Sequence, residues 1–206
     1  MSGVKSEAAD GGVIGNVYDK YGTKNPIARY LMKGFLEGVT SLYRRTGART
    51  VLEVGCGEGK LAHHLVTEGG APERFVATDV EVAQVHGVDP RIEVRAASAY
   101  ELPFADRSFE LVVCCEVLEH LERPMVALAE LARVASRAVI VSTPREPLWR
   151  ALNMARGKYL AELGNTPGHI QHYSRRDLLL LCKTHLDIVE VKNPVPWTML
   201  LGEPRR

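Results

Sequence analysis

The chain has 206 residues, of which 46% are hydrophobic and 25% charged, and its formal net charge is +1. This length and composition are typical of one globular domain, and the near-neutral charge gives no overall attraction to nucleic acid or to an anionic membrane. No apolar run is long enough to span a membrane, and the N-terminus is too polar and acidic for a signal peptide.

The first predicted helix follows an N-terminal stretch that we expect to be a mobile arm, residues 1–23. Asn25 and Pro26 supply an N-cap and a proline for the first helical turn, and apolar residues then recur at helical spacing. Gly47 is expected to end this helix. The rest of the chain, residues 24–206, is predicted to be a single domain.

Strands and helices alternate after that point. Strands are predicted near residues 50–54, 74–79, 91–96, 109–115 and 137–142, and helices near 59–68, 123–135 and 174–184, with a short helix between 79 and 91. Two closing strands, 186–191 and 197–201, leave little room for a helix between them. The pattern predicts an α/β fold of Rossmann-like type, a mostly parallel sheet with helices on both faces and an antiparallel edge hairpin.

An insertion at about residues 145–168 interrupts the alternation. Its apolar stretch, which includes Trp149 and Tyr159, is expected to be helical, and arginines such as Arg145 and Arg150 are interspersed. The insertion follows a strand, and open α/β sheets bind ligands outside the carboxyl ends of their strands. We therefore predict a lid over the substrate, and an ordinary packed helix is the alternative.

Residues 51–61 contain the most informative pattern, a short apolar run followed by a glycine-rich turn and an amphipathic run. Glycines at 55, 57 and 59 allow positive φ angles and a close approach of the backbone to a ligand. The following helix presents unpaired N–H groups and a positive dipole end to that ligand. Glu53 adds a negative charge, which suits a ligand with an ammonium group better than a pyrophosphate.

Three segments together resemble one known family. Residues 53–59 (Glu-Val-Gly-Cys-Gly-Glu-Gly), Asp79 at the end of the second strand, and residues 98–112 match, in order, motifs of class I S-adenosylmethionine-dependent methyltransferases, type 11-like. The resemblance covers residues 50–201. Ser98 departs from the aspartate that is common there. A nicotinamide dehydrogenase is the competing interpretation, but its fingerprint is Gly-x-Gly-x-x-Gly, whereas this chain has Gly-x-Gly-x-Gly.

The resemblance implies that S-adenosyl-L-methionine is bound at the ends of the first strands. The residues implied are Glu53, Gly55, Cys56, Gly57, Gly59, Asp79, Val80, Ser98, Ala99 and Glu116. Asp79 would hold the ribose hydroxyls, and Ser98 and Ala99 would lie beside the adenine. Tyr18, Tyr21 and Lys24 are placed by position alone as a cover over the cofactor.

A second cluster follows the fourth strand. If the chain turns helically there, Glu116, Glu119 and His120 are spaced i, i+3 and i+4 and share a face. Two further histidines, His169 and His172, precede Ser174, which is expected to cap the next helix. Carboxylates and imidazoles grouped in this way can bind a divalent metal, serve as acid/base groups near the transferred methyl, or act only as caps and ion pairs.

This cluster resembles two branches of the family. Ubiquinone-biosynthesis O-methyltransferases carry Glu-x-x-Glu-His at this place, and small-RNA terminal 2′-O-methyltransferases add a downstream histidine. The resemblance implies Glu116, Glu119, His120 and His169 as ligands of Mg²⁺ or Mn²⁺, which would lower the pKa of an acceptor hydroxyl. Without a metal, His120 or His172 would take the proton.

The function predicted from these patterns is methyl transfer to a hydroxyl of a small-molecule acceptor, with sugars and lipid-linked compounds among the candidates. RNA 2′-O-methylation, N- or C-methylation and a non-catalytic cofactor-binding scaffold stay open as alternatives. The four cysteines lack paired spacing, which favours reduced, buried thiols in a cytoplasmic protein. The protein is expected to be a monomer or homodimer, with peripheral membrane contact open.

Overall fold

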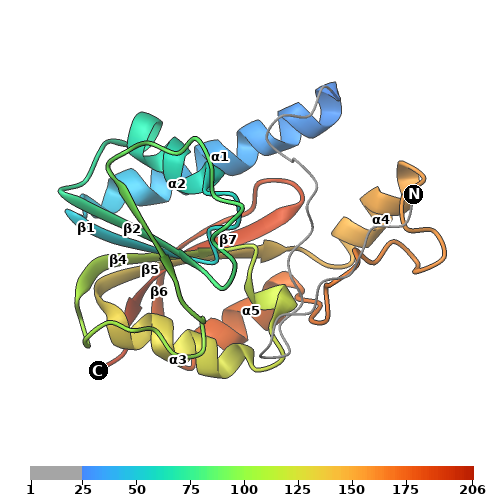
Figure 1. Ribbon diagram of the computed structural model, residues 1–206. Helices are drawn as coiled ribbons and strands as arrows, with labels where there is room; N and C mark the ends of the chain where they lie inside the picture. The colour runs from blue at the N-terminus through green and yellow to red at the C-terminus, as the bar shows by residue number, and fades with distance from the viewer. Residues whose placement is uncertain (1–24) are drawn as a thin grey trace.

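The computed structural model describes residues 25–206, which form a seven-stranded sheet covered by helices on both faces (Figure 1). The expected arm, residues 1–23, and the proposed cover of Tyr18, Tyr21 and Lys24 lie outside the described residues. The strands are β1 (Thr50–Val54), β2 (Arg74–Asp79), β3 (Ile92–Ala96), β4 (Phe109–Cys115), β5 (Ala135–Pro144), β6 (Leu186–Lys192) and β7 (Trp197–Pro204).

The order of the strands across the sheet is β3-β2-β1-β4-β5-β7-β6. Strands β1 to β5 pair in parallel, whereas β7 is antiparallel to both β5 and β6. This confirms the predicted fold and its antiparallel edge hairpin. The order reverses between β1 and β4, and the carboxyl ends of those two strands are where such sheets bind ligands.

The helical segments are α1 (Pro26–Thr46), α2 (Lys60–His64), the π-helical turn η1 (Leu65–Gly69), the 3₁₀ turn η2 (Leu118–His120), α3 (Pro124–Val134), α4 (Leu148–Ala155) and α5 (Arg175–Cys182). Helices α1 and α2 pack on one face of the sheet and α3 and α5 on the other (Figure 1). Each face buries its own apolar core, with Phe35 and Phe75 in one and Phe109 in the other. Among residues 25–206, no helix has the length and apolar character needed to cross a bilayer.

The predicted helix signals are confirmed by the cap geometry. Asn25 Oδ1 accepts a hydrogen bond of 2.9 Å from the Ile27 N–H, and Gly47 ends α1 in the left-handed region with φ 56°. Ser174 and Asp177 form a reciprocal capping box at the start of α5. The four cysteines are free and buried, as expected.

Two local predictions are wrong. Residues 80–91 contain no helix, and Gly87 in this segment has a φ of 64°, a left-handed angle that interrupts a right-handed helix. Val85 and Val88 pack closely on Gly59, where a Cβ would lie 3.0 and 2.6 Å from them. The predicted helix over 59–68 is shared between α2 and η1. It widens into a π turn where Thr67 Oγ1 donates a 2.8 Å hydrogen bond to the His63 carbonyl.

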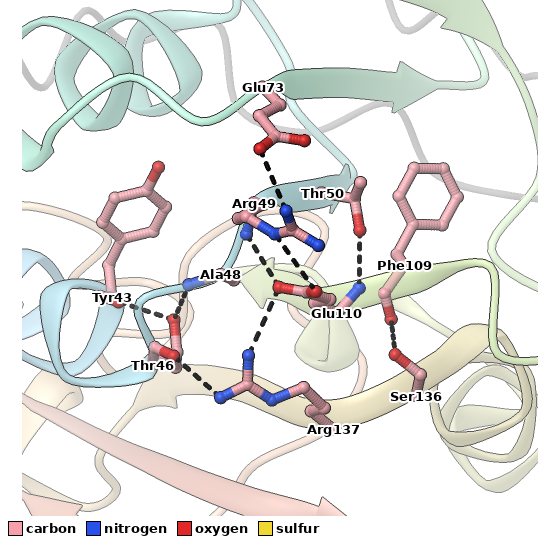
Figure 2. A network of polar contacts seen from close by, with 10 residues as sticks. All are labelled: Tyr43, Thr46, Ala48, Arg49, Thr50, Glu73, Phe109, Glu110, Ser136 and Arg137. Carbon is pink, nitrogen blue, oxygen red and sulfur yellow. Dashed lines mark hydrogen bonds and ion pairs between the residues drawn. The ribbon is translucent and has the colours of Figure 1, made fainter.

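A polar network fixes the amino ends of the central strands, opposite the ligand-binding edge (Figure 2). The Arg49 N–H and the Arg137 guanidinium donate to Glu110 Oε2 at 2.8 and 3.3 Å, and the Glu110 N–H donates to Thr50 Oγ1 at 2.9 Å. Arg137 also reaches the Thr46 carbonyl at the end of α1. The hydrogen bond from the Arg49 backbone N–H, and then the positive charges of Arg137 and Arg49, hold the pKa of Glu110 below its usual range.

The insertion at residues 145–168 follows the carboxyl end of β5 (Figure 1). Only Leu148–Ala155 is helical, and Tyr159 lies in the turns that follow, so the expected helix is shorter than its apolar pattern. That this insertion acts as a lid stays a prediction.

Candidate active site

The glycine-rich loop after β1 is tied to the end of β2 by backbone hydrogen bonds. The N–H groups of Gly55 and Cys56 donate to the Thr78 carbonyl at 2.7 and 2.9 Å. The next N–H along the chain, that of Gly57, donates to Asp79 Oδ2 at 2.8 Å. Asp79, which the sequence resemblance assigns to the ribose hydroxyls, therefore lies beside the loop.

Glu53 is a buried carboxylate beneath this loop. Its side chain is 2% exposed, and its Oε2 has no hydrogen-bond partner within residues 25–206. Burial, and then the charge of Asp79, raise the pKa of Glu53 to about 8. A buried carboxylate without a counter-ion is a costly group, and a ligand with an ammonium group would relieve that cost.

The three glycines have different surroundings. A Cβ at Gly55 would lie 2.3 Å from a methyl group of Val117, and Gly59 is covered by Val85 and Val88. Gly57 has φ 54°, and no described atom lies within 4 Å of where its Cβ would be. The loop is therefore packed at both ends and open in its middle, a cradle in which a ligand can lie against the backbone.

The predicted adenine-side segment is held by Arg133 from α3. Its guanidinium donates to the Leu102 and Phe104 carbonyls at 3.0 and 2.8 Å. Ser98 Oγ accepts a hydrogen bond of 3.3 Å from the Tyr100 N–H, which leaves the hydroxyl a second lone pair. Ala99 and Val80 are the remaining neighbours predicted for the cofactor, and Val80 is 48% exposed although apolar.

A second group of side chains converges after β4. Ligand atoms of Glu119, His120 and His169 all lie within 4.8 Å of one another, although His169 is about 50 residues downstream. The Glu119 carbonyl accepts hydrogen bonds of 3.0 Å from the Ile170 and Gln171 N–H groups, which brings the two loops together. Glu119 and His169 are buried, at 2% and 6% exposure.

The orientation of His120 is fixed by a hydrogen bond of 2.9 Å between its Nδ1 and the Gly168 carbonyl. A carbonyl only accepts, so Nδ1 carries the proton, and Nε2 of the neutral ring carries the lone pair. That tautomer suits a metal ligand or a general base.

Glu116 does not belong to this group, and the expectation that it shares a helical face with Glu119 and His120 is wrong. Its φ of 62° turns the chain out of a helix, while its N–H still pairs with the Ser142 carbonyl of β5. Its carboxylate accepts from Ser142 Oγ at 3.1 Å and from Trp197 Nε1 at 2.7 Å. His172 is exposed, bonded through Nε2 to Asn165 Oδ1 at 2.8 Å, and also lies outside the group.

The comparison with known proteins agrees with this geometry. A family model described as a methyltransferase domain matches residues 52–141, from the glycine loop to β5. A ubiquinone biosynthesis O-methyltransferase of Xanthomonas oryzae is 32% identical over 151 residues, 67% of this chain and 60% of that protein. The chain belongs to the class I S-adenosylmethionine-dependent methyltransferases.

Other members of the family are similar over shorter stretches or in fold alone. A probable S-adenosylmethionine-dependent methyltransferase of Mycobacterium tuberculosis is 40% identical over 105 residues, 48% of this chain and 37% of that protein. The methyltransferase domain of bacterial CtHen1-CN superposes with a TM-score of 0.62 at 19% identity, over 84% of this chain and 99% of that one. The chain thus spans about four-tenths to six-tenths of the length of these curated relatives.

The two parts of the site in this methyltransferase are electrostatically close. Burial raises the pKa of the Cys115 thiol at the end of β4, and the carboxylates of Glu116, Glu53 and Glu119 add to that effect. The charge of Glu53 beneath the glycine loop and the charge of Glu119 in the second group therefore both act on the same buried thiol. The end of β4 joins the predicted cofactor site to the cluster.

Sequence reasoning missed part of the surroundings of this site. Trp149 was singled out only as an apolar lid residue, yet its indole stacks on His169, with ring centroids 6.1 Å apart and an interplanar angle of 24°. Its Nε1 donates to Thr166 Oγ1 at 2.9 Å. Trp197 was placed only in a strand. The composition held a signal, because these are the two tryptophans of the chain.

Proposed function

We propose that this protein transfers the methyl group of S-adenosylmethionine to a hydroxyl oxygen of an acceptor. The observation that carries the proposal is the convergence of Glu119, His120 and His169 next to the end of β4. The similarity to a protein named as a ubiquinone biosynthesis O-methyltransferase also favours oxygen as the acceptor atom.

The glycine-loop region fits the cofactor in charge and in shape. Glu53 offers a buried negative charge for the ammonium group, and Asp79 offers a carboxylate for the ribose hydroxyls. The open middle of the loop, at Gly57, lets a ligand approach the backbone. When bound, S-adenosylmethionine supplies an electrophilic methyl group on a sulfonium centre.

His120 is the residue proposed to take the proton of the acceptor hydroxyl. The Gly168 carbonyl keeps the proton of the neutral ring on Nδ1, so Nε2 accepts the new one. The buried carboxylate of Glu119 then stabilises the imidazolium. General-base help of this kind contributes about 10²–10⁴-fold, and alignment of the reactants supplies much of the remainder.

A divalent metal is the alternative way in which the same cluster could activate the hydroxyl. Glu119, His120 and His169 would hold it, whereas Glu116, the fourth ligand implied by the sequence resemblance, is engaged by Trp197. Two imidazoles and one carboxylate suit Mn²⁺ better than Mg²⁺, which prefers oxygen ligands. Such an ion would lower the pKa of the acceptor hydroxyl.

Calorimetric titration with S-adenosylhomocysteine, combined with turnover on catechol and sugar acceptors, tests the proposal. His120→Ala should keep the wild-type affinity for S-adenosylhomocysteine and lose turnover by at least about 10²-fold. His185→Ala, at a partly exposed histidine bonded to Thr184, is the matched control. Full activity in His120→Ala, or failure of the wild type to bind S-adenosylhomocysteine, would contradict the proposal.

A direct measurement of metal binding distinguishes activation of the hydroxyl by His120 from activation by a divalent metal. If a metal is used, Mn²⁺ followed by electron paramagnetic resonance should bind the EDTA-treated protein at one site, and His169→Ala should lose that site. Turnover that is unchanged by EDTA supports His120 as the base without a metal.

A further inference from the structure

A small cavity lies between the start of α1, α4 and the start of β7, beside the candidate active site. Its volume is about 70 Å³, and the residues that matter for its chemistry are Leu31, Trp149, Leu152, Arg156, Lys158 and Trp197. These come from three segments far apart in the sequence. Figure 1 shows the start of α1 and α4 on the same side of the molecule.

The inner wall of this cavity is made of two indoles that also contact predicted catalytic residues. The rings of Trp149 and Trp197 lie 5.7 Å apart between centroids, at 55°. Trp149 stacks on His169, and Trp197 donates a hydrogen bond to Glu116. A molecule in the cavity is therefore one side chain away from the cluster proposed to activate the hydroxyl.

The lining combines apolar surface with positive charge. Besides the indoles it presents Leu31 and Leu152, and its two charged members, Arg156 and Lys158, are both cations at exposed positions. No carboxylate is among the described lining residues. An apolar molecule with an anionic group matches this combination, and a cationic one does not.

The size of the cavity limits what its apolar part can hold. An engineered apolar cavity of about 150 Å³ accepts benzene, and this one is about 70 Å³. It is therefore suited to a slim aliphatic segment and not to a nucleobase. Next in sequence to the lining residues Ala28, Leu31 and Tyr159 are three apolar side chains, Ile27, Tyr30 and Leu160, which are 70%, 77% and 59% exposed. They offer further apolar surface to a longer chain.

We propose that this cavity binds the methyl acceptor and that the acceptor is an anionic amphiphile. An aliphatic segment packs between Leu31, Leu152 and the indoles, the anionic group meets Arg156 and Lys158, and the hydroxyl faces the cluster. This assignment rests on the proposed methyltransferase function, because it names the substrate class of that same site.

The two tryptophans of the chain both line the cavity, so intrinsic fluorescence reports its occupancy. Decyl phosphate, titrated below its micelle concentration, should give a saturable change in tryptophan emission. Inorganic phosphate and decyltrimethylammonium should give none. An equal response to the cationic amphiphile, or no saturable response to decyl phosphate, overturns the proposal.

Variants test which residues are responsible. Arg156→Gln with Lys158→Gln should raise the Kd for decyl phosphate at least tenfold, and Leu152→Glu should abolish the response. The control pair Arg176→Gln with Lys183→Gln removes two exposed cations from α5 and its end, and should leave the Kd within twofold of the wild type. An unchanged Kd in the Arg156 and Lys158 variant overturns the assignment.

Calorimetry with S-adenosylhomocysteine on the same samples separates this proposal from the one it rests on. Decyl phosphate binding without S-adenosylhomocysteine binding would overturn the methyltransferase function, and with it the assignment of the cavity to an acceptor. S-adenosylhomocysteine binding without decyl phosphate binding would leave the methyltransferase function standing and overturn only the cavity.

Discussion

Trp197 Nε1 donates a 2.7 Å hydrogen bond to Oε2 of Glu116, although the two residues are 81 positions apart in the sequence. The other carboxylate oxygen of Glu116 accepts from Ser142. Three neighbouring strands, β4, β5 and β7, are thereby joined at the edge of the sheet where the site lies. This bond fixes the wall of the proposed acceptor cavity relative to the end of β4.

The Glu116–Trp197 bond should carry a measurable coupling energy. A hydrogen bond to a charged group contributes about 1.5–3 kcal/mol, so Trp197→Phe and Glu116→Ala should be non-additive by roughly that amount in the free energy of unfolding. Urea denaturation of the wild type, both single variants and the double variant gives the coupling. Additive effects would show that the bond does not stabilise the fold.

Asp79→Asn should weaken S-adenosylhomocysteine binding by about 10–100-fold. The substitution removes the charge that also receives the Gly57 N–H, and charge-assisted hydrogen bonds are worth about 1.5–3 kcal/mol. Isothermal titration calorimetry measures the change. Asp187→Asn, at an exposed aspartate paired with Arg205, is the control and should bind as the wild type does. Equal losses in both variants would argue against a role for Asp79 in binding.

Glu53 should make the ligand-free protein less stable as the pH rises. Its pKa is raised from 4.5 to about 8 in the folded state. The stabilising contribution of the protonated Glu53 to the free energy of unfolding is therefore fully present below pH 4.5 and is lost as the pH rises through 8. One proton gives a slope of at most about 1.4 kcal/mol per pH unit. Glu53→Gln should remove this slope in melting temperatures measured from pH 5 to 8.

Glu203→Gln, at an exposed glutamate, is the control in this pH series, and its stability should depend on pH as that of the wild type does. S-adenosylhomocysteine carries an ammonium group, so it should stabilise the wild type more at pH 8 than at pH 5. Parallel curves for the wild type and Glu53→Gln would show that Glu53 does not titrate in this range.

Alanine at two glycines of the loop should destabilise the fold to different extents. Gly57→Ala adds a methyl group in open space at φ 54°, so it should cost about 1–2 kcal/mol of stability and strongly weaken S-adenosylhomocysteine binding. Gly55→Ala places its Cβ 2.3 Å from Val117 and should destabilise the fold by more than that. Thermal melts and calorimetry separate the two effects. Equal melting temperatures would contradict the packing difference.

The sequence was sufficient for the features that depend on local chemistry. Glycine spacing, the cap residues Asn25 and Ser174, and apolar periodicity act within a few residues of one another, so they predicted the strands, most helices and the family. Asp79 was predicted at the end of the second strand, where β2 does end, and it lies beside the loop because parallel strands bring their carboxyl ends to one edge. The segment 80–91 was misassigned because a helix was expected there from the alternation of strands and helices, whereas Gly87 takes a left-handed φ of 64° within it.

The cluster of Glu119, His120 and His169 also depends partly on the local sequence and partly on the tertiary structure. The sequence by itself determined that Glu119 and His120 follow the fourth strand and that His169 precedes the next helix. The tertiary structure decided that these three residues converge while Glu116 does not. Helical spacing suggested one face for Glu116, Glu119 and His120, but a positive φ at Glu116 and its bonds to Ser142 and Trp197 direct it elsewhere. Those partners lie 26 and 81 residues away, and contacts at such separations are set by the pairing of strands and not by the local pattern.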